Sequence, residues 1–124
     1  MTNCDCGSKK NYMDCCGQYI KKQWLPETPE ALMRSRYTAY VKMELDYLQE
    51  TSLPAVPTVI NEPVKHHIDW LGLEMLNVEM RPENPAIGFV EFKAKYRTQG
   101  EQHTIHEKSE FHKKGGRWYY VGKT

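Results

Sequence analysis

The sequence predicts an α+β fold in which a short cysteine-rich segment precedes a helical part and four antiparallel strands. Three observations lead to this prediction. All four cysteines lie between positions 4 and 16, a helical apolar period runs through residues 27–50, and residues 73–121 alternate between apolar and polar side chains with turn residues between them. At 124 residues and 14.6 kDa, we expect one compact domain, residues 27–124, with a cysteine segment, residues 1–17, attached to it.

The cysteine segment contains Cys4, Cys6, Cys15 and Cys16. Four thiolates so close in sequence suit a tetrahedral Zn²⁺ site, and a site closed by four sulfurs is structural because it leaves no position for water. Disulfides between the neighbouring cysteines would close strained, very small rings. Redox chemistry through a labile disulfide and plain structural thiols are the alternatives. The N-terminus has no signal-peptide pattern, so we expect a cytoplasmic protein with reduced thiols and one structural Zn²⁺.

This segment resembles the SEC-C zinc motif that ends the SecA preprotein translocase. Eight residues separate Cys6 from Cys15, as in that motif, and the neighbouring residues that recur are Gly7, Ser8, Lys10, Tyr12 and Gly17. The chain departs from the motif at Lys9, where glycine is usual. The resemblance implies a docking role toward a protein partner that is still unidentified, with Lys9, Lys10 and Tyr12 presenting the surface of the zinc loop.

The overall composition argues against several classes of partner. Seventeen basic and sixteen acidic residues give a formal net charge of +1, so no general electrostatic footprint for nucleic acid is present. No apolar run approaches the roughly 20 residues of a membrane-spanning helix, so we expect no membrane insertion. Strand alternation separates His103 from His106 and His112, which argues against a second metal site built from histidines.

Residues 18–26 are expected to be a tether whose apolar side chains pack the cysteine segment onto the domain; these are Tyr19, Ile20, Trp24 and Leu25. A helix is expected to begin after Thr28, a good N-cap, with Pro29 in the first helical position. It should continue to about Glu50 because an apolar stripe follows helical spacing through Met33, Tyr37, Tyr40, Val41, Leu45 and Leu48.

The rest of the chain predicts a loop, a short helix and strands. Three prolines between Thr51 and Pro63 exclude a long helix there, and residues 64–70 are expected to form a second, short helix. Strands are expected at residues 73–81, 87–98, 103–112 and 117–121. Their short connections indicate an antiparallel meander.

Alternation along the predicted strands places one carboxylate inside. Glu107 and Ser109 share a face with Ile105 and Phe111, which belong in the core. A buried carboxylate needs a partner, and Arg36, Arg34 or a tyrosine hydroxyl is the expected one.

Longer runs of sequence resemble the YchJ-like family, which joins a SEC-C knuckle to the cone-shaped, cystatin-like fold of nuclear transport factor two. The runs are ALMRSRY at residues 31–37, WLGLE at 70–74, VEF at 90–92, YR at 96–97, HEKSEF at 106–111 and GRWYYV at 116–121. The resemblance implies zinc binding and one long and one short helix on a curved four-stranded antiparallel sheet. It implies no established reaction.

Two functions follow as hypotheses. The first is a protein-interaction module stabilised by the four-cysteine zinc site. The alternative is a small-molecule receptor or acid/base enzyme that uses the cone cavity around Glu107. The other residues expected to line this cavity are Arg36, Tyr37, Ser109, Trp118 and Tyr120. An ion pair of Glu107 with Arg36 or Arg34 is the simpler expectation, and it would make Glu107 a poor base near neutral pH.

Overall fold

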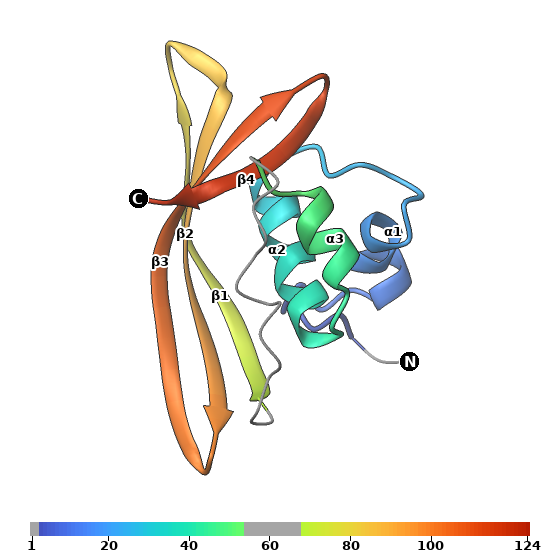
Figure 1. Cartoon of the computed structure of the whole chain (residues 1–124), viewed down its shortest axis with the longest axis vertical. Helices are drawn as coiled ribbons and strands as arrows, with labels where there is room; N and C mark the ends of the chain where they lie inside the picture. The colour runs from blue at the N-terminus through green and yellow to red at the C-terminus, as the bar shows by residue number, and fades with distance from the viewer. Residues whose placement is uncertain (1–2, 54–67) are drawn as a thin grey trace.

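The computed structural model of the chain describes residues 3–53 and 68–124 and has helices on one side of a β-sheet (Figure 1). The helical elements are a 3₁₀ turn η1 at Tyr12–Asp14, α1 at Cys16–Ile20, α2 at Pro29–Val41 and α3 at Leu45–Glu50. The strands are β1 at Ile68–Arg81, β2 at Asn84–Thr98, β3 at Glu101–Lys114 and β4 at Arg117–Lys123. Within these described ranges, no helix is both long and apolar enough to cross a membrane.

The four strands form an open antiparallel sheet in the order β1-β2-β3-β4, which confirms the predicted meander. Register shifts interrupt the pairing of β1 with β2 and of β3 with β4. Such bulges bend strands and increase their twist, and the strands are visibly bent in Figure 1. The α+β class and the curved four-stranded sheet are therefore as the sequence predicts.

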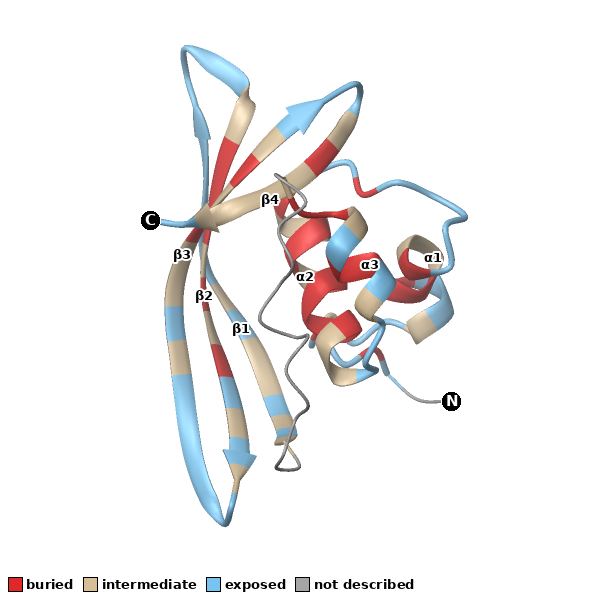
Figure 2. Cartoon of the chain, viewed as in Figure 1, coloured by how far each residue is buried: buried red, intermediate tan, exposed pale blue. Residues whose placement is uncertain are grey.

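The core lies between the helices and the facing side of the sheet (Figure 2). On β2, Val90, Phe92 and Ala94 are buried, whereas the intervening Glu91, Lys93 and Lys95 are half-buried or exposed. Side chains alternate between the two faces of a strand, so this pattern turns one face of β2 toward α2. The predicted assignment of the inner face is confirmed.

Helix α2 starts as expected but ends earlier than predicted. Thr28 Oγ1 accepts the backbone N–H of Ala31 at 3.0 Å, which caps the N-terminus. At the other end the N–H of Glu44 bonds the carbonyl of Ala39 at 2.8 Å, and that of Met43 bonds Tyr40 at 3.3 Å. These bonds define a Schellman motif, with Met43 in the left-handed region at φ 58°.

The single helix expected to reach Glu50 is therefore wrong, and α2 and α3 are separate helices. The apolar stripe continued across the break because α3 also buries its apolar side chains against the core. Tyr47 and Leu48 are the buried residues of α3. The apolar periodicity indicates which side chains are buried. It does not indicate where a helix ends when the residue in the left-handed conformation is not the usual glycine.

The second short helix expected at residues 64–70 is wrong in its described part. Ile68, Asp69 and Trp70 belong to β1 and pair with Thr98, Arg97 and Tyr96 of β2. Residues 64–67 lie outside the described ranges. The mistake arose because a short apolar run fits a helical and an extended period equally well, and long-range pairing decided between them.

The residues expected to tether the cysteine segment are only partly packed. Ile20 is buried at the end of α1, and Tyr19 packs against the core. Trp24 and Leu25 are 67% and 50% exposed, so they do not fix the segment to the domain. The packing comes from Tyr19 and Ile20 in α1, the helix that lies against α2.

Candidate metal centre

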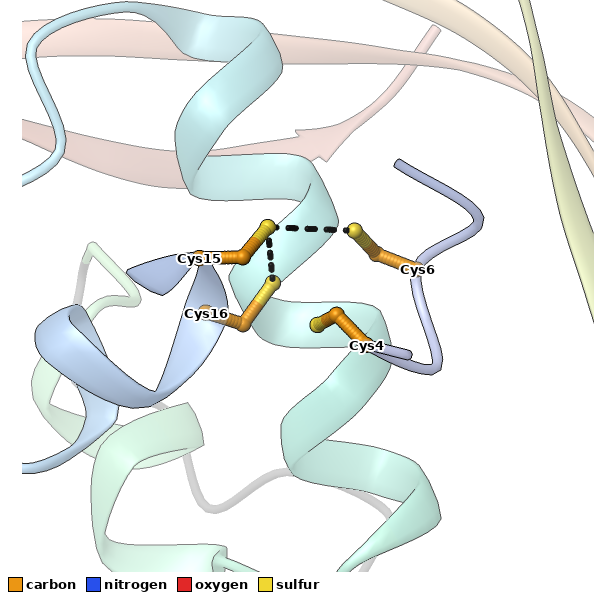
Figure 3. A group of neighbouring side chains, drawn as sticks. All are labelled: Cys4, Cys6, Cys15 and Cys16. Carbon is orange, nitrogen blue, oxygen red and sulfur yellow. Dashed lines mark hydrogen bonds between the residues drawn. The ribbon is translucent and has the colours of Figure 1, made fainter. Parts of the chain in front are cut away.

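The four cysteine sulfurs converge in front of α2 (Figure 3). All four Sγ atoms lie within 4.8 Å of one another; Cys6 and Cys15 are 3.6 Å apart, and Cys15 and Cys16 are 3.9 Å apart. Tetrahedral ligation with metal–sulfur bonds of about 2.3 Å would place the sulfurs about 3.8 Å apart. The cluster therefore has dimensions suited to one metal ion ligated by four sulfurs.

Local backbone structure brings the two pairs of cysteines together. Cys4 and Cys6 lie on a loop closed by a bond from the N–H of Cys4 to the carbonyl of Lys10, at 2.7 Å. Cys15 and Cys16 lie where the turn η1 meets α1, and Asn11 caps that turn by accepting the N–H of Met13. Two short local structures thus present two sulfurs each toward a common point.

The cluster is part of the domain core. Cys4, Cys6, Cys15 and Cys16 are only 4%, 0%, 9% and 1% exposed and belong to the same buried cluster as Leu32 and Ala39 of α2. None of the four cysteines forms a disulfide. Bound metal would be enclosed by protein on most sides, which is typical of a structural site.

Helix α2 supplies polar groups that suit thiolate ligands. Arg34 Nη1 donates to the carbonyl oxygen of Cys6 at 2.8 Å and lies 3.9 Å from its sulfur, while Glu30 holds Arg34 Nε at 3.0 Å. Thr38 Oγ1 lies 3.6 Å from the sulfur of Cys4. Arg34 and Thr38 are four residues apart and therefore share one face of the helix. Such outer groups orient ligands and stabilise their charge.

The thiols have pKa values that differ strongly. A hydrogen bond with the Cys16 thiol lowers the pKa of Cys6 to about 4, and this same hydrogen bond raises the pKa of Cys16. Burial raises the pKa of Cys15. The cluster itself thus favours one thiolate, and a bound cation would be needed to hold the other sulfurs in the thiolate form near neutral pH.

Sequence reasoning missed the contributions of Arg34 and Thr38 to this site. The sequence predicts Arg34 as a possible partner of Glu107, and no sequence pattern assigns a role to Thr38. The available signal was the spacing of these two polar residues, which places them four positions apart on one face of the helix. That signal has meaning only once the face of α2 that meets the cysteines is known.

Lys9 occupies the position where the SEC-C motif usually has glycine, and its φ of 68° lies in the left-handed region. A side chain with a Cβ is strained there, and glycine is not. The variant Lys9→Gly is therefore expected to raise the free energy of unfolding by about 0.5–1 kcal/mol, measured by urea denaturation of the metal-loaded protein. Glycine at the exposed Lys10, which has no positive φ, is the control and should not stabilise. An equal effect of both changes would contradict this explanation.

The residues expected to present an interaction surface differ in exposure. Lys9 and Lys10 are exposed, whereas Tyr12 is half-buried. The ring of Tyr12 packs so closely on Gly17 that a Cβ there would lie 2.8 Å from it, and Lys42 Nζ lies 4.5 Å above the ring. Tyr12 therefore has a packing role, and the two lysines form the exposed part of this surface.

A cavity of about 440 Å³ lies between α2 and the sheet. Of the residues expected around it, Arg36, Tyr37, Glu107, Ser109 and Tyr120 line it. Trp118 does not, and its Nε1 instead donates to the carbonyl oxygen of Glu27 at 3.1 Å. Trp118 and Tyr120 share a face of β4, but two residues along a strand cover about 6.6 Å, which carries Trp118 beyond the cavity.

The expected ion pair of Glu107 with Arg36 or Arg34 is wrong. Glu107 Oε1 lies 3.8 Å from Lys123 Nζ at the end of β4. Arg34 pairs with Glu30, and Arg36 Nη1 donates to oxygens of Leu48, Thr51 and Ser52. Both arginines are held by other partners, Arg34 by Glu30 and Cys6 and Arg36 by the end of α3, so neither pairs with Glu107.

The histidines described by the structure lie apart from the cysteines along β3. His106 Nε2 lies 2.7 Å from Glu91 Oε2, His112 pairs with Glu110, and His103 stacks on Tyr96. Among residues 3–53 and 68–124, Cys4, Cys6, Cys15 and Cys16 form the one cluster with metal-ligand geometry.

Fold and site together define a protein with a SEC-C-type cysteine cluster packed on an NTF2-like α+β domain. The sequence profile described as "YchJ, middle NTF2-like domain" matches residues 28–123. The chain therefore belongs to the YchJ family. It is 38% identical to a UPF0225 protein of Haemophilus influenzae over all of this chain and 78% of that protein, and 39% identical to one of Bordetella pertussis over 95% of this chain and 89% of that protein.

Two solved structures are similar to the whole chain. The solution structure of a SEC-C motif containing protein from Rhodopseudomonas palustris matches with a TM-score of 0.86 and 37% identity, covering 99% of this chain and 98% of the other. The crystal structure of a SEC-C motif containing protein from Psychrobacter arcticus matches with a TM-score of 0.77 and 27% identity, covering 98% and 81%. The predicted family and fold are confirmed, and the four cysteines form a candidate metal site.

Proposed function

We propose that the cysteine cluster binds one structural Zn²⁺ and that the zinc-stabilised segment docks a protein partner. The mutual approach of four buried sulfurs within 4.8 Å supports the metal proposal. Zinc is the ion proposed because four thiolates in a closed tetrahedral arrangement are a preferred zinc environment. The four free cysteines are consistent with a reducing compartment, which we propose is the cytoplasm.

Metal content tests the zinc proposal. The protein is purified without chelator or a histidine tag and analysed by mass spectrometry beside the double variant Cys15→Ser, Cys16→Ser. About one zinc per chain is expected for the parent protein and none for the variant. Another metal at that ratio would overturn the identity of the ion. No metal, with titratable thiols or a disulfide, would overturn the site and favour redox chemistry.

The docking proposal rests on the position of two exposed cations beside the cluster. Four thiolates and one divalent ion give the site a formal charge of about −2. Arg34 is engaged beneath it, whereas Lys9 and Lys10 are exposed on the outer side of the loop. Metal binding would fix the loop that carries both lysines, so a partner with acidic side chains could recognise a rigid pair of charges.

Charge reversal tests the docking proposal without removing the core. The variant Lys9→Glu, Lys10→Glu is compared in pull-downs with Lys113→Glu, Lys114→Glu, which makes the same charge change at the exposed end of β3. We expect a partner that is retained by the parent protein and by the Lys113→Glu, Lys114→Glu variant. The Lys9→Glu, Lys10→Glu variant should lose it. All three proteins must retain zinc. Equal recovery of partners by both variants would contradict docking at the cysteine loop.

A second candidate function is favoured by the cavity. Its volume of about 440 Å³ falls in the range of sites that bind small molecules, and five of its twelve lining residues are aromatic. Glu107, the acidic residue of this lining, lies 3.8 Å from Lys123 Nζ. The size and the lining of the cavity support a role in binding.

A further inference from the structure

We infer that the cavity between α2 and the sheet binds a small aromatic carboxylate, whose carboxylate group pairs with Arg36. This inference rests on the second function proposed above, and it adds the chemical class of the ligand. Neither the zinc proposal nor the docking proposal depends on it.

Arg36 is a buried cation, and all its hydrogen-bond partners in the described part of the chain are neutral. It is 3% exposed, and its Nη1 donates to the carbonyl oxygen of Leu48 at 2.9 Å, to Thr51 Oγ1 at 2.6 Å and to Ser52 Oγ at 3.1 Å. No carboxylate among residues 3–53 and 68–124 forms a salt bridge with it.

The oxygens around Arg36 lie at the C-terminal end of α3, which offers a partial negative charge only. The ring of Tyr120 lies 4.5 Å from the guanidinium carbon and adds a cation–π contact. These contacts satisfy hydrogen bonds without neutralising a full charge in a buried position. Burial accordingly lowers the pKa of Arg36, and an anion in the cavity would oppose that effect.

Arg36 also lines the cavity, so this cation lies beside the space that a ligand would occupy. The other charged residues of the lining are Glu107 and Lys123, which lie 3.8 Å apart and offset each other. The remaining charge is that of Arg36. The cavity therefore favours a ligand with one negative charge.

The rest of the lining suits a flat aromatic body. Tyr37, Tyr40, Trp70 and Tyr120 contribute rings, and Met33, Phe92, Ala94 and Ile105 contribute apolar surface. Trp70 already makes an edge-on contact with Tyr37 at 5.6 Å and a tilted contact with Tyr40 at 6.1 Å. Aromatic ligands make favourable offset or edge contacts with rings arranged in this way.

Calorimetric titration of the zinc-loaded full chain tests the inference with two matched pairs of probes. These are phenylacetate with phenylacetamide, and indole-3-acetate with indole-3-acetamide. Each amide has the shape of its acid but no charge. We expect the acids to bind at least about tenfold more tightly than the amides.

Three variants locate the binding in the cavity. Arg36→Gln is expected to remove the preference for the acid. Glu107→Gln removes a like charge from the lining without touching Arg36, and it should tighten acid binding about three- to tenfold. Glu91→Gln makes the same charge change on the opposite face of the sheet and should leave the affinity unchanged.

The outcomes distinguish failure of this inference from failure of the proposal that the cavity binds small molecules. Equal affinities for acid and amide, together with no effect of Glu107→Gln, would overturn anion selection and leave the cavity as a neutral binding site. No binding of any probe to the parent protein at millimolar concentration would overturn both. If Arg36→Gln fails to fold, the acid–amide comparison and Glu107→Gln still decide the inference.

Discussion

Replacing Cys6 with serine is expected to abolish metal binding and to destabilise the entire described domain. Cys6 is fully buried, and its sulfur lies 3.6 Å from that of Cys15. Structural four-ligand zinc sites contribute roughly 10–16 kcal/mol of apparent binding free energy, which is similar to the roughly 5–15 kcal/mol stability of a whole domain. Loss of one ligand should therefore leave the protein largely unfolded at ambient temperature.

The reason for a global effect is the position of the cluster in the core. The sulfurs pack with Leu32 and Ala39 of α2, and α2 contacts the sheet. A disordered cysteine segment would expose that side of α2 to water. Loss of the ligand should thus propagate through α2 to the sheet.

Thermal unfolding followed by circular dichroism, with metal content measured on the same samples, checks this expectation. Met13→Ser is the matched control because Met13 lies in the same segment but is 44% exposed. It should keep the metal and unfold near the parent temperature. A Cys6→Ser protein that loses the metal but unfolds at the parent temperature would contradict a structural role for the cluster.

Replacing Phe111 with alanine is expected to cost about 3–5 kcal/mol of unfolding free energy. Phe111 is fully buried on β3, and its ring meets the ring of Tyr120 edge-on with centroids 5.8 Å apart. The residue that pairs with Phe111 on the neighbouring strand β2 is Gly88, which has no side chain to fill the space left by the ring. A Cβ on Gly88 would lie 2.7 Å from Pro29, so the surroundings are tightly packed and cannot collapse easily.

Phe89→Ala provides the comparison for this measurement. Phe89 is also buried, at 9% exposed, but it lies on the outer face of the sheet beneath Arg81 and Lys108. Long flexible side chains can close over a missing ring, so this variant should lose about 1–2 kcal/mol less than Phe111→Ala. Urea denaturation of the metal-loaded proteins measures both. Equal losses would contradict the assignment of the core to the helical face.

Local sequence patterns were sufficient for the strands and for the group of cysteines. Val90, Phe92 and Ala94 alternate with charged residues, and this alternation depends only on which face of β2 is buried. The four cysteines lie within thirteen residues, so only a short loop has to close to bring their sulfurs to one metal ion. Both predictions use contacts that are near in sequence, or a period that is independent of the partner.

The remaining errors involve partners chosen by the tertiary fold. Met43 ends α2 in a left-handed conformation, which a methionine in the sequence does not predict. Glu107 pairs with Lys123 because β4 returns along β3, with Ser109 opposite Lys123. Arg36 turns to α3 because the break at Met43 brings that helix back alongside α2. No local pattern contains this information.

Helix α2 is the common wall of both candidate sites. Arg34 and Thr38 face the cysteine cluster, whereas Arg36, Tyr37 and Tyr40 face the cavity. A helix moves largely as a rigid rod, so a shift or rotation of α2 that accompanies events at the sulfurs must also move the cavity residues. Such a movement would couple metal loading to cavity shape through one helix, and by thermodynamic reciprocity each site would then influence the affinity of the other.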